Sequence, residues 1–168
     1  GYGIPGQHGG NAGIGHVRYA TSGGDNLNEA QPFQFNAGIE AALAFNGNIA
    51  NFRELVRKYV LRGIAINPQI DTTVIQQVVS DHLIEGSFID SPHALARTLD
   101  GAYSLVMINE LGQIVAYRDH HGFKPLCFTV TNDMLLIASE SVALSKYGSS
   151  VETLQPGCSL WYSPDEGS

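Results

Sequence analysis

The chain has 168 residues, of which 43% are hydrophobic and 15% are charged. This length is enough to bury one core and too short for two ordinary domains, so we expect one globular domain. Nine basic against sixteen acidic residues give a net charge of -7, the wrong sign for a surface that neutralises nucleic-acid phosphates. No apolar run approaches the roughly 18 residues that a membrane-spanning helix requires. The sequence therefore predicts a protein that binds neither nucleic acid nor membranes.

The two cysteines, Cys127 and Cys158, are too few and too isolated in sequence for a disulfide scaffold or a zinc cluster. This cysteine usage is typical of a reducing compartment, so we expect a cytoplasmic protein. The first residue is Gly1 and the sequence enters mid-pattern, so we expect the natural protein to extend upstream.

The first elements expected along the chain are a short strand over residues 13–19 and a hairpin over residues 34–46 that turns at residues 36–38. After the hairpin, apolar residues recur at the i, i+3, i+4 and i+7 spacing of an amphipathic helix. We expect Asn51 to cap this helix and Gly63 to end it.

Two further helices and a block of strands are expected next. Asp71 can cap a helix that Gly86 closes, and Ser91 with Pro92 opens a third, shorter helix. Four near-continuous apolar runs follow, and runs without alternation imply strands covered on both faces. These runs are residues 102–108, 113–118, 125–130 and 134–139. Covered strands with helices inserted between strand blocks favour a layered α+β domain, with sheets packed together and helices outside.

Arg18 lies in a run of small and apolar residues that leads into the turn at residues 21–24. An arginine in such a strand is costly unless its guanidinium faces water or an anion. The local pattern leaves two possibilities open, a surface strand with Arg18 in solvent and a binding site for a carboxylate ligand.

Asn46 and Gly47 lie in residues 45–51, which are expected to form a strand-to-helix turn. A side-chain amide beside an unshielded glycine N–H can hold an oxyanion during acyl transfer, although the same pair also suits the backbone angles of a turn. Asp71 is equally ambiguous, because it can cap a helix or receive an ammonium group.

Residues 118–126 contain Asp119 and the adjacent histidines His120 and His121. Neighbouring side chains diverge, and no other ligand residue falls at a supporting spacing, so no metal site is expected. The segment predicts a structural turn between two strands.

Several segments, taken in order, follow the pattern of one enzyme family. They are residues 15–21, 29–33, 46–51, 118–126 and 138–140, with residues 155–157 before a closing strand at 159–162. The chain resembles the class II glutamine amidotransferases, whose glutaminase domain belongs to the N-terminal-nucleophile hydrolases, and it follows the amidophosphoribosyltransferase pattern. The resemblance implies a four-layer αββα sandwich, incomplete at its N-terminus. It also implies hydrolysis of glutamine to glutamate and ammonia for phosphoribosylamine synthesis in purine biosynthesis.

The resemblance assigns roles to the ambiguous residues. It implies that Arg18 binds the α-carboxylate of glutamine, that Asp71 binds its α-amino group and that Thr21 helps to line the pocket. It implies that Asn46 and Gly47 form the oxyanion hole. No cofactor is expected in this domain, whereas magnesium is expected with a phosphoribosyltransferase domain beyond it. A homo-oligomer is also expected.

In this family the nucleophile is an N-terminal cysteine whose own α-amino group acts as the base. Gly1 has no side chain, Cys127 falls in a predicted strand and Cys158 falls in the closing turn. We therefore expect the 168-residue chain alone to be inactive, with the nucleophile in upstream sequence.

The sequence departs from the family at Phe45, where histidine usually precedes Asn-Gly, and at Ile70 and Thr73 beside Asp71. Phe45 and residues 51–55 are also similar to asparagine synthetases, which are the alternative enzymes, and glucosamine-6-phosphate synthase fits less well. A module that binds glutamine without cleaving it is the alternative from another functional class.

Overall fold

The computed structural model describes residues 10–17, 30–147 and 150–164. Within these ranges the chain forms a five-stranded and a three-stranded antiparallel sheet with four helices. In chain order the elements are β1 (Phe33–Asn36), β2 (Glu40–Ile49), α1 (Phe52–Leu61), α2 (Asp71–Leu83), α3 (Ser91–Thr98), β3 (Gly101–Asn109), β4 (Ile114–Arg118), β5 (Cys127–Val130), β6 (Leu135–Ala138), α4 (Ser141–Leu144), β7 (Glu152–Thr153) and β8 (Ser159–Tyr162).

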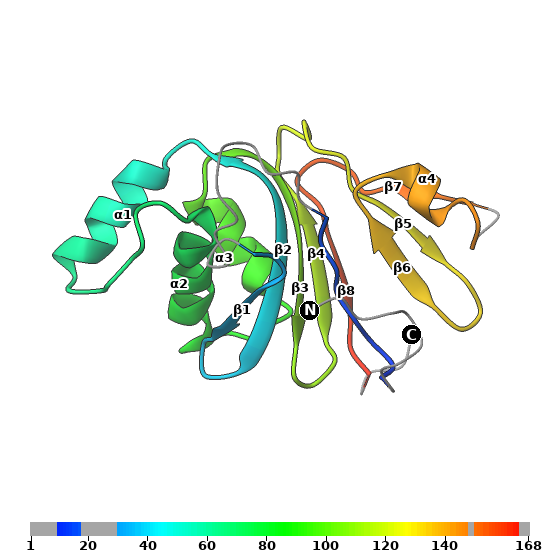
Figure 1. Cartoon of the computed structure of the whole chain (residues 1–168), viewed down its shortest axis with the longest axis horizontal. Coiled ribbons are helices and arrows are strands. Elements are labelled where there is room, and N and C mark those ends of the chain that lie inside the picture. The colour runs from blue at the N-terminus through cyan, green and yellow to red at the C-terminus, as the bar shows by residue number, and fades with distance from the viewer. Residues whose placement is uncertain (1–9, 18–29, 148–149, 165–168) are drawn as a thin grey trace.

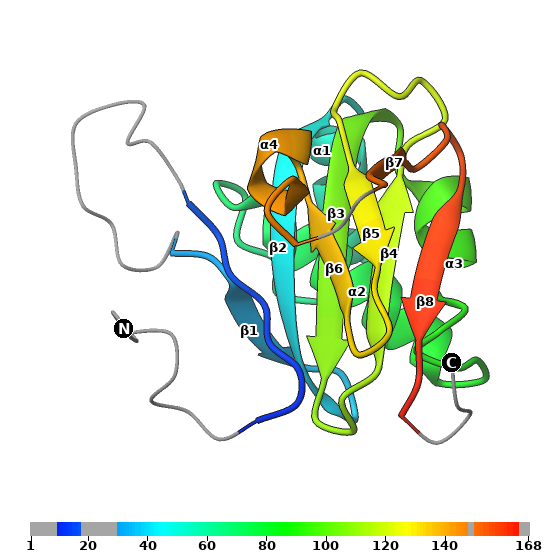
Figure 2. The ribbon, with the colours of Figure 1, turned by 90° about the vertical axis from the view of Figure 1, so that its right-hand side faces the viewer.

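The large sheet has the strand order β1-β2-β3-β4-β8, and the small sheet has the order β6-β5-β7. Helices α1, α2 and α3 lie on one side of the large sheet, and the small sheet lies on its other side (Figure 1). Figure 2 views the molecule from the side of the small sheet, with α4 beside β6. The architecture is the layered α+β fold that the order of strands and helices in the sequence predicted.

The helix-covered face of the large sheet carries the main core. Leu43 and Phe45 alternate along β2 with residues that face the other way, and both are buried in this core. Tyr103 of β3 lies beside them, and α2 contributes Val74 and Val78 from successive turns. Full burial of such side chains stabilises the fold by about 1.5–3 kcal/mol each.

The opposite face of the same sheet is closed only in part. Near β4 it is covered, because Ala116 is buried with Leu126 and Leu154 in a second, smaller core. At β2 the residues that point to this face, including Ala42 and Asn46, stay partly exposed. The space between the two sheets is therefore more accessible beside β2 than beside β4.

Asn51 is the N-cap residue of α1, as predicted, but its side chain makes no capping hydrogen bond to the helix. Its side-chain amide donates to the Thr98 carbonyl at 2.9 Å, and its side-chain oxygen accepts the Asp100 N–H at 3.0 Å. Asn51 thus ties the start of α1 to the link between α3 and β3. The other end of α1 is as predicted, with Gly63 just beyond its last residues.

The N-cap of α2 is Ile70, and Asp71 is the first helical residue. The expectation that Asp71 caps the helix is therefore wrong, because an N-cap residue must precede the first helical turn. The third helix begins at Ser91 and Pro92, as predicted.

Strand expectations at residues 102–108, 113–118, 125–130 and 134–139 are confirmed as β3 to β6. By contrast, residues 13–17 form no strand, and the remainder of the strand expected at residues 13–19 lies outside the described residues. Glycines at positions 13 and 15 offer no side chain to pack and weaken a strand there.

The strand-to-helix turn expected at residues 45–51 is much shorter than predicted. β2 continues through Asn46 and Gly47 to Ile49, because its ladder with β3 runs on to the pair Ile49–Gly101. Only Ala50 and Asn51 connect β2 to α1. None of the helices in the described ranges combines the length and the apolarity needed to cross a membrane.

Candidate active site

Asn46 lies in β2 directly opposite Ser104 of β3. Its neighbour Phe45 points into the helix-side core, so strand alternation directs the Asn46 side chain to the opposite face, toward the space between the sheets. Asn46 is partly exposed, and within the described ranges its side-chain amide makes no hydrogen bond. The amide is therefore available to a ligand on that face.

Gly47 is packed against β3 so closely that no other residue fits. It has φ +155°, and an added Cβ would lie 2.3 Å from the Ala102 carbonyl oxygen and 2.5 Å from the Tyr103 Cα. Separations under 3.0 Å are not tolerated without movement of the backbone. Close packing thus explains why a glycine occupies position 47, independently of any catalytic role.

The backbone of Tyr103 determines where Gly47 directs its own N–H. The Tyr103 N–H donates to Asp119 Oδ2 at 3.0 Å, and the Tyr103 carbonyl accepts the Asp119 N–H at 3.0 Å. Both backbone groups of Tyr103 therefore face β4. On the other side of β3, Tyr103 is paired with Gly47 of β2, and this pair exchanges no backbone hydrogen bonds. The N–H of Gly47 therefore points away from β3.

The N–H of Phe45 shows to which edge of β2 the Gly47 N–H points, because the N–H groups of alternate residues in a strand point to the same edge. Phe45 donates its N–H to the side-chain oxygen of Gln31 at 2.7 Å. β1 pairs with β2 only as far as Leu43, so Gly47 lies beyond the last pair of β1. The Asn46 amide and the Gly47 N–H are therefore neighbouring donors, one on the face of β2 and the other at its β1-side edge.

Asp71 stands in the first turn of α2, where the partial positive charge of a helix N-terminus favours a carboxylate. Burial raises the pKa of its carboxyl group above the ordinary value. In the part of the chain that the structure describes, this carboxylate has no hydrogen bond or ion pair. A partly buried carboxylate without a partner is suited to receive an ammonium group.

The structure places Asp71 and Asn46 on different sides of the large sheet. α2 packs on the helix side of β2, whereas the Asn46 side chain emerges on the other face. Arg18 and Thr21 lie outside the described residues, so their convergence on this site stays a prediction.

Arg118 and Asp119 form the structural turn that the sequence predicted. Arg118 donates to the carbonyl oxygens of Lys124 at 2.9 Å and Leu154 at 2.8 Å, and also to that of Gly122. Among the described residues, no cluster of three His, Cys, Asp or Glu side chains that could hold a metal ion includes these histidines.

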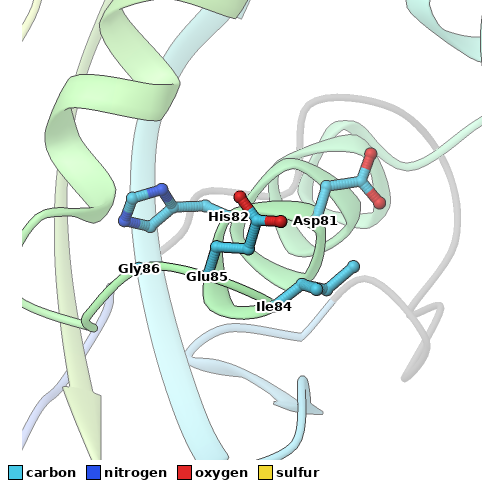
Figure 3. Close-up of a pocket in the computed structure, with 5 residues that line it drawn as sticks. All are labelled: Asp81, His82, Ile84, Glu85 and Gly86. Atoms are coloured by element: carbon cyan, nitrogen blue, oxygen red, sulfur yellow. The ribbon is translucent and has the colours of Figure 1, made fainter.

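A separate hollow lies at the C-terminal end of α2 and is lined by Asp81, His82, Ile84, Glu85 and Gly86 (Figure 3). His82 and Asp81 point to different sides of it. The Asp81 carboxylate is paired with Arg62 at 2.6 Å, and the His82 ring contacts Gly86 and the Ser87 carbonyl. These side chains serve the local structure and do not converge on a ligand.

Residues 16–146 match the family described as glutamine amidotransferase domain. The chain belongs to this family. This amidotransferase domain is 39% identical over 148 residues to the amidophosphoribosyltransferase of Archaeoglobus fulgidus, covering 86% of this chain and 32% of that protein. It is 35% identical over 153 residues to the amidophosphoribosyltransferase of Escherichia coli, covering 83% of this chain and 30% of that protein. The domain thus spans about a third of the length of these relatives.

Solved structures give the same relationship. The amidotransferase domain aligns with the allosteric regulatory enzyme of purine biosynthesis at a TM-score of 0.76 and 29% identity, over 89% of this chain and 32% of the other. It aligns with the glutamine phosphoribosylpyrophosphate amidotransferase from B. subtilis at a TM-score of 0.74 and 28% identity, with the same coverage.

The sequence did not reveal how Tyr103 and Asp119 build this site. Tyr103 was one apolar residue in a predicted strand, and Asp119 was assigned to a turn. The available signal was an aspartate placed directly after a predicted strand with glycine three residues later, which is typical of a side chain that accepts local backbone N–H groups.

Proposed function

We propose that this chain is the glutaminase part of an amidophosphoribosyltransferase. It hydrolyses glutamine to glutamate and ammonia, and the ammonia is used for phosphoribosylamine synthesis in purine biosynthesis. The observation that carries this proposal is the pair of neighbouring donors in a glutamine amidotransferase domain, the Asn46 amide on the accessible face of β2 and the Gly47 N–H at its β1-side edge.

The proposed chemistry assigns each site residue one task. Arg18 binds the α-carboxylate of glutamine, Asp71 binds its α-amino group and Thr21 lines the pocket. The α-amino group of an N-terminal cysteine takes the thiol proton, the thiolate attacks the side-chain carbonyl carbon, and the same proton is passed to the nitrogen that leaves as ammonia. Water then hydrolyses the thioester to glutamate and regenerates the thiol. Asn46 and Gly47 donate to the oxygen that becomes negatively charged in both tetrahedral intermediates.

The remaining parts of the proposal concern the complete protein. Its nucleophile is a cysteine upstream of residue 1, and its glutaminase domain is a four-layer αββα sandwich. A phosphoribosyltransferase part, which would use magnesium, accepts the ammonia. We further propose a cytoplasmic homo-oligomer.

The test uses the protein encoded by the complete reading frame. With phosphoribosyl pyrophosphate and magnesium, we expect it to release glutamate from glutamine and to form phosphoribosylamine from either glutamine or ammonium. Formation of asparagine from aspartate and ATP would identify the alternative enzyme instead. Saturable glutamine binding without any glutamate release would identify a binding module.

A further inference from the structure

The side chain of Asp119 is completely buried at the end of β4, and its oxygens accept three backbone N–H groups. Oδ2 accepts the N–H of Tyr103 at 3.0 Å, and Oδ1 accepts those of His121 at 2.7 Å and Gly122 at 3.1 Å. The bonds to His121 and Gly122 are local and would be sufficient to shape the turn. The bond to Tyr103 is not local, because it joins the turn to another strand.

The side chain of the adjacent Arg118 binds other groups and makes no hydrogen bond to Tyr103. Its guanidinium donates to three backbone carbonyls, those of Lys124, Leu154 and Gly122. The two neighbouring charged residues therefore have separate partners. Arg118 binds backbone carbonyls in and near the turn, whereas Asp119 binds the Tyr103 N–H of β3.

Asp119 extends the β3–β4 ladder by one residue beyond its last pair, Ser104–Arg118. Its side chain and its own N–H bind both backbone groups of Tyr103. On its other side Tyr103 is in direct contact with Gly47, where even a methyl group has no room. A displacement of Tyr103 would therefore be transmitted directly to Gly47.

We propose that Asp119 is a positioning residue for the oxyanion hole. By binding Tyr103 it keeps the backbone groups of that residue turned toward β4, which fixes the place of Gly47 and directs the Gly47 N–H to the accessible edge of β2. This inference rests on the proposed function, because it concerns the same pair of donors.

Asparagine at position 119 would not reproduce this arrangement. A carboxylate accepts at both oxygens, whereas an amide has one accepting oxygen and an NH₂ group that only donates. Asp119→Asn therefore sets a donor against either the Tyr103 N–H or the N–H groups of the turn. Arg118→Lys is the matched control, because it removes bonds of the same turn and leaves the Asp119–Tyr103 contacts in place.

The experiment compares both variants with Asn46→Ala in the complete protein, with glutamine and separately with ammonium as the nitrogen donor. Asp119→Asn should lower the glutamine-dependent kcat by about tenfold to a hundredfold, as displacement of a reacting group by about 1 Å can do. Its KM for glutamine should stay within about threefold, since an oxyanion donor acts mainly in the transition state. Its ammonium-dependent rate should be unchanged, and Arg118→Lys should lower Tm while keeping kcat.

Several results would overturn the inference. One is an Asp119→Asn variant with wild-type glutamine-dependent kcat, and another is an equal loss of the glutamine-dependent and ammonium-dependent reactions. If Asp119→Asn does not fold, Asp119→Glu takes its place, and failure of both to fold would assign Asp119 to the stability of the whole domain. A wild-type protein without glutamine hydrolysis, or an Asn46→Ala variant without a defect, would instead refute the proposed function.

Discussion

The two faces of the large sheet differ although they are formed by the same strands. On the helix side, β2 buries Leu43 and Phe45 among side chains of α2 and β3. On the other side, Ala42, Ala44 and Asn46 of the same strand stay partly exposed. Alternation along one strand thus separates residues that stabilise the fold from a residue that is available to a ligand.

This difference shows where substitutions should affect stability and where they should affect chemistry. The side chains buried between α2, β2 and β3 are closely packed and leave no space for a ligand, so changes among them should act through the free energy of unfolding. Substitutions on the accessible side should leave the free energy of unfolding nearly unchanged and should alter the rate of glutamine hydrolysis. Each prediction below tests this division, beginning with the largest effect on hydrolysis.

The largest effect should come from the nucleophile. We expect no glutamine hydrolysis by the 168-residue chain alone, and recovery when upstream sequence that begins with a free cysteine is added. Replacement of that cysteine by alanine should abolish glutamate release. Replacing both Cys127 and Cys158 by serine in the complete protein should leave hydrolysis intact, because the first is buried in β5 and the second lies in a turn. Hydrolysis that depended on either internal cysteine would contradict the mechanism.

Asn46→Ala in the complete protein should lower the glutamine-dependent kcat by roughly a hundredfold to a thousandfold, because one oxyanion donor is lost. The KM for glutamine should change little. Asn48→Ala is the matched control, since Asn48 lies two residues along β2, on the same face, and is exposed. The assignment fails if Asn48→Ala is equally damaging, or if Asn46→Ala also abolishes the reaction with ammonium.

Asp71→Asn should raise the KM for glutamine by about tenfold to a hundredfold, the range expected when a hydrogen bond to a charged group is lost. Glu54→Gln, an acidic residue in the first turn of α1, should have no such effect. Because burial raises the pKa of Asp71, glutamine binding should weaken as pH falls through that raised pKa. Steady-state kinetics over a pH series would show both effects, and a KM without this pH dependence would argue against Asp71 as the ammonium site.

Asp71→Asn should weaken glutamine binding, but it should stabilise the ligand-free protein at neutral pH. The folded state favours the neutral Asp71 carboxyl, so its contribution is fully present below the unfolded pKa and is lost as pH rises through the raised folded pKa. Asp71→Asn should therefore raise Tm at neutral pH and have less effect below the ordinary value of 3.8. A lower Tm at neutral pH would show that stabilisation of the carboxylate, by the helix N-terminus or by a partner, outweighs the cost of its burial.

Leu43→Ala should have the smallest effect on hydrolysis per folded molecule. It should lower the free energy of unfolding by about 2–5 kcal/mol, because Leu43 is fully buried on the helix side. Ala44→Ser, at the adjacent residue on the accessible face, should change it by less than about 0.5 kcal/mol. Denaturant unfolding measures the change in free energy for both variants. A loss of kcat per folded molecule in Leu43→Ala would contradict the proposed division between the two faces.

The sequence predicted most of the fold because strand and helix periodicity is local. It failed at β2, where residues 46–49 were expected to form a turn. The ladder that makes them a strand depends on the close approach of Gly47 and Gly101, which are far apart along the chain. Asp71 was expected to be an N-cap because an aspartate in the first helical turn and a capping aspartate have nearly the same sequence context.

The resemblance names the residue types of the candidate site, and these assignments stay predictions; it does not give their geometry. The resemblance picked out Asn46 and Gly47, but the direction of the Gly47 N–H follows from the contacts of Tyr103 with Asp119. These two residues are sixteen positions apart, and no periodicity in the sequence links them. Arg18 and Thr21 stay predictions of the sequence alone.

Arg118 joins the two sheets at one level of the molecule. It is the last residue of β4 in the large sheet, and it donates to the carbonyl of Leu154, which follows β7 of the small sheet. Asn46, Ser104 and Arg118 stand in one row across the large sheet. The hydrogen bond from Arg118 to Leu154 therefore ties the small sheet to the same row of the large sheet that carries the Asn46 amide.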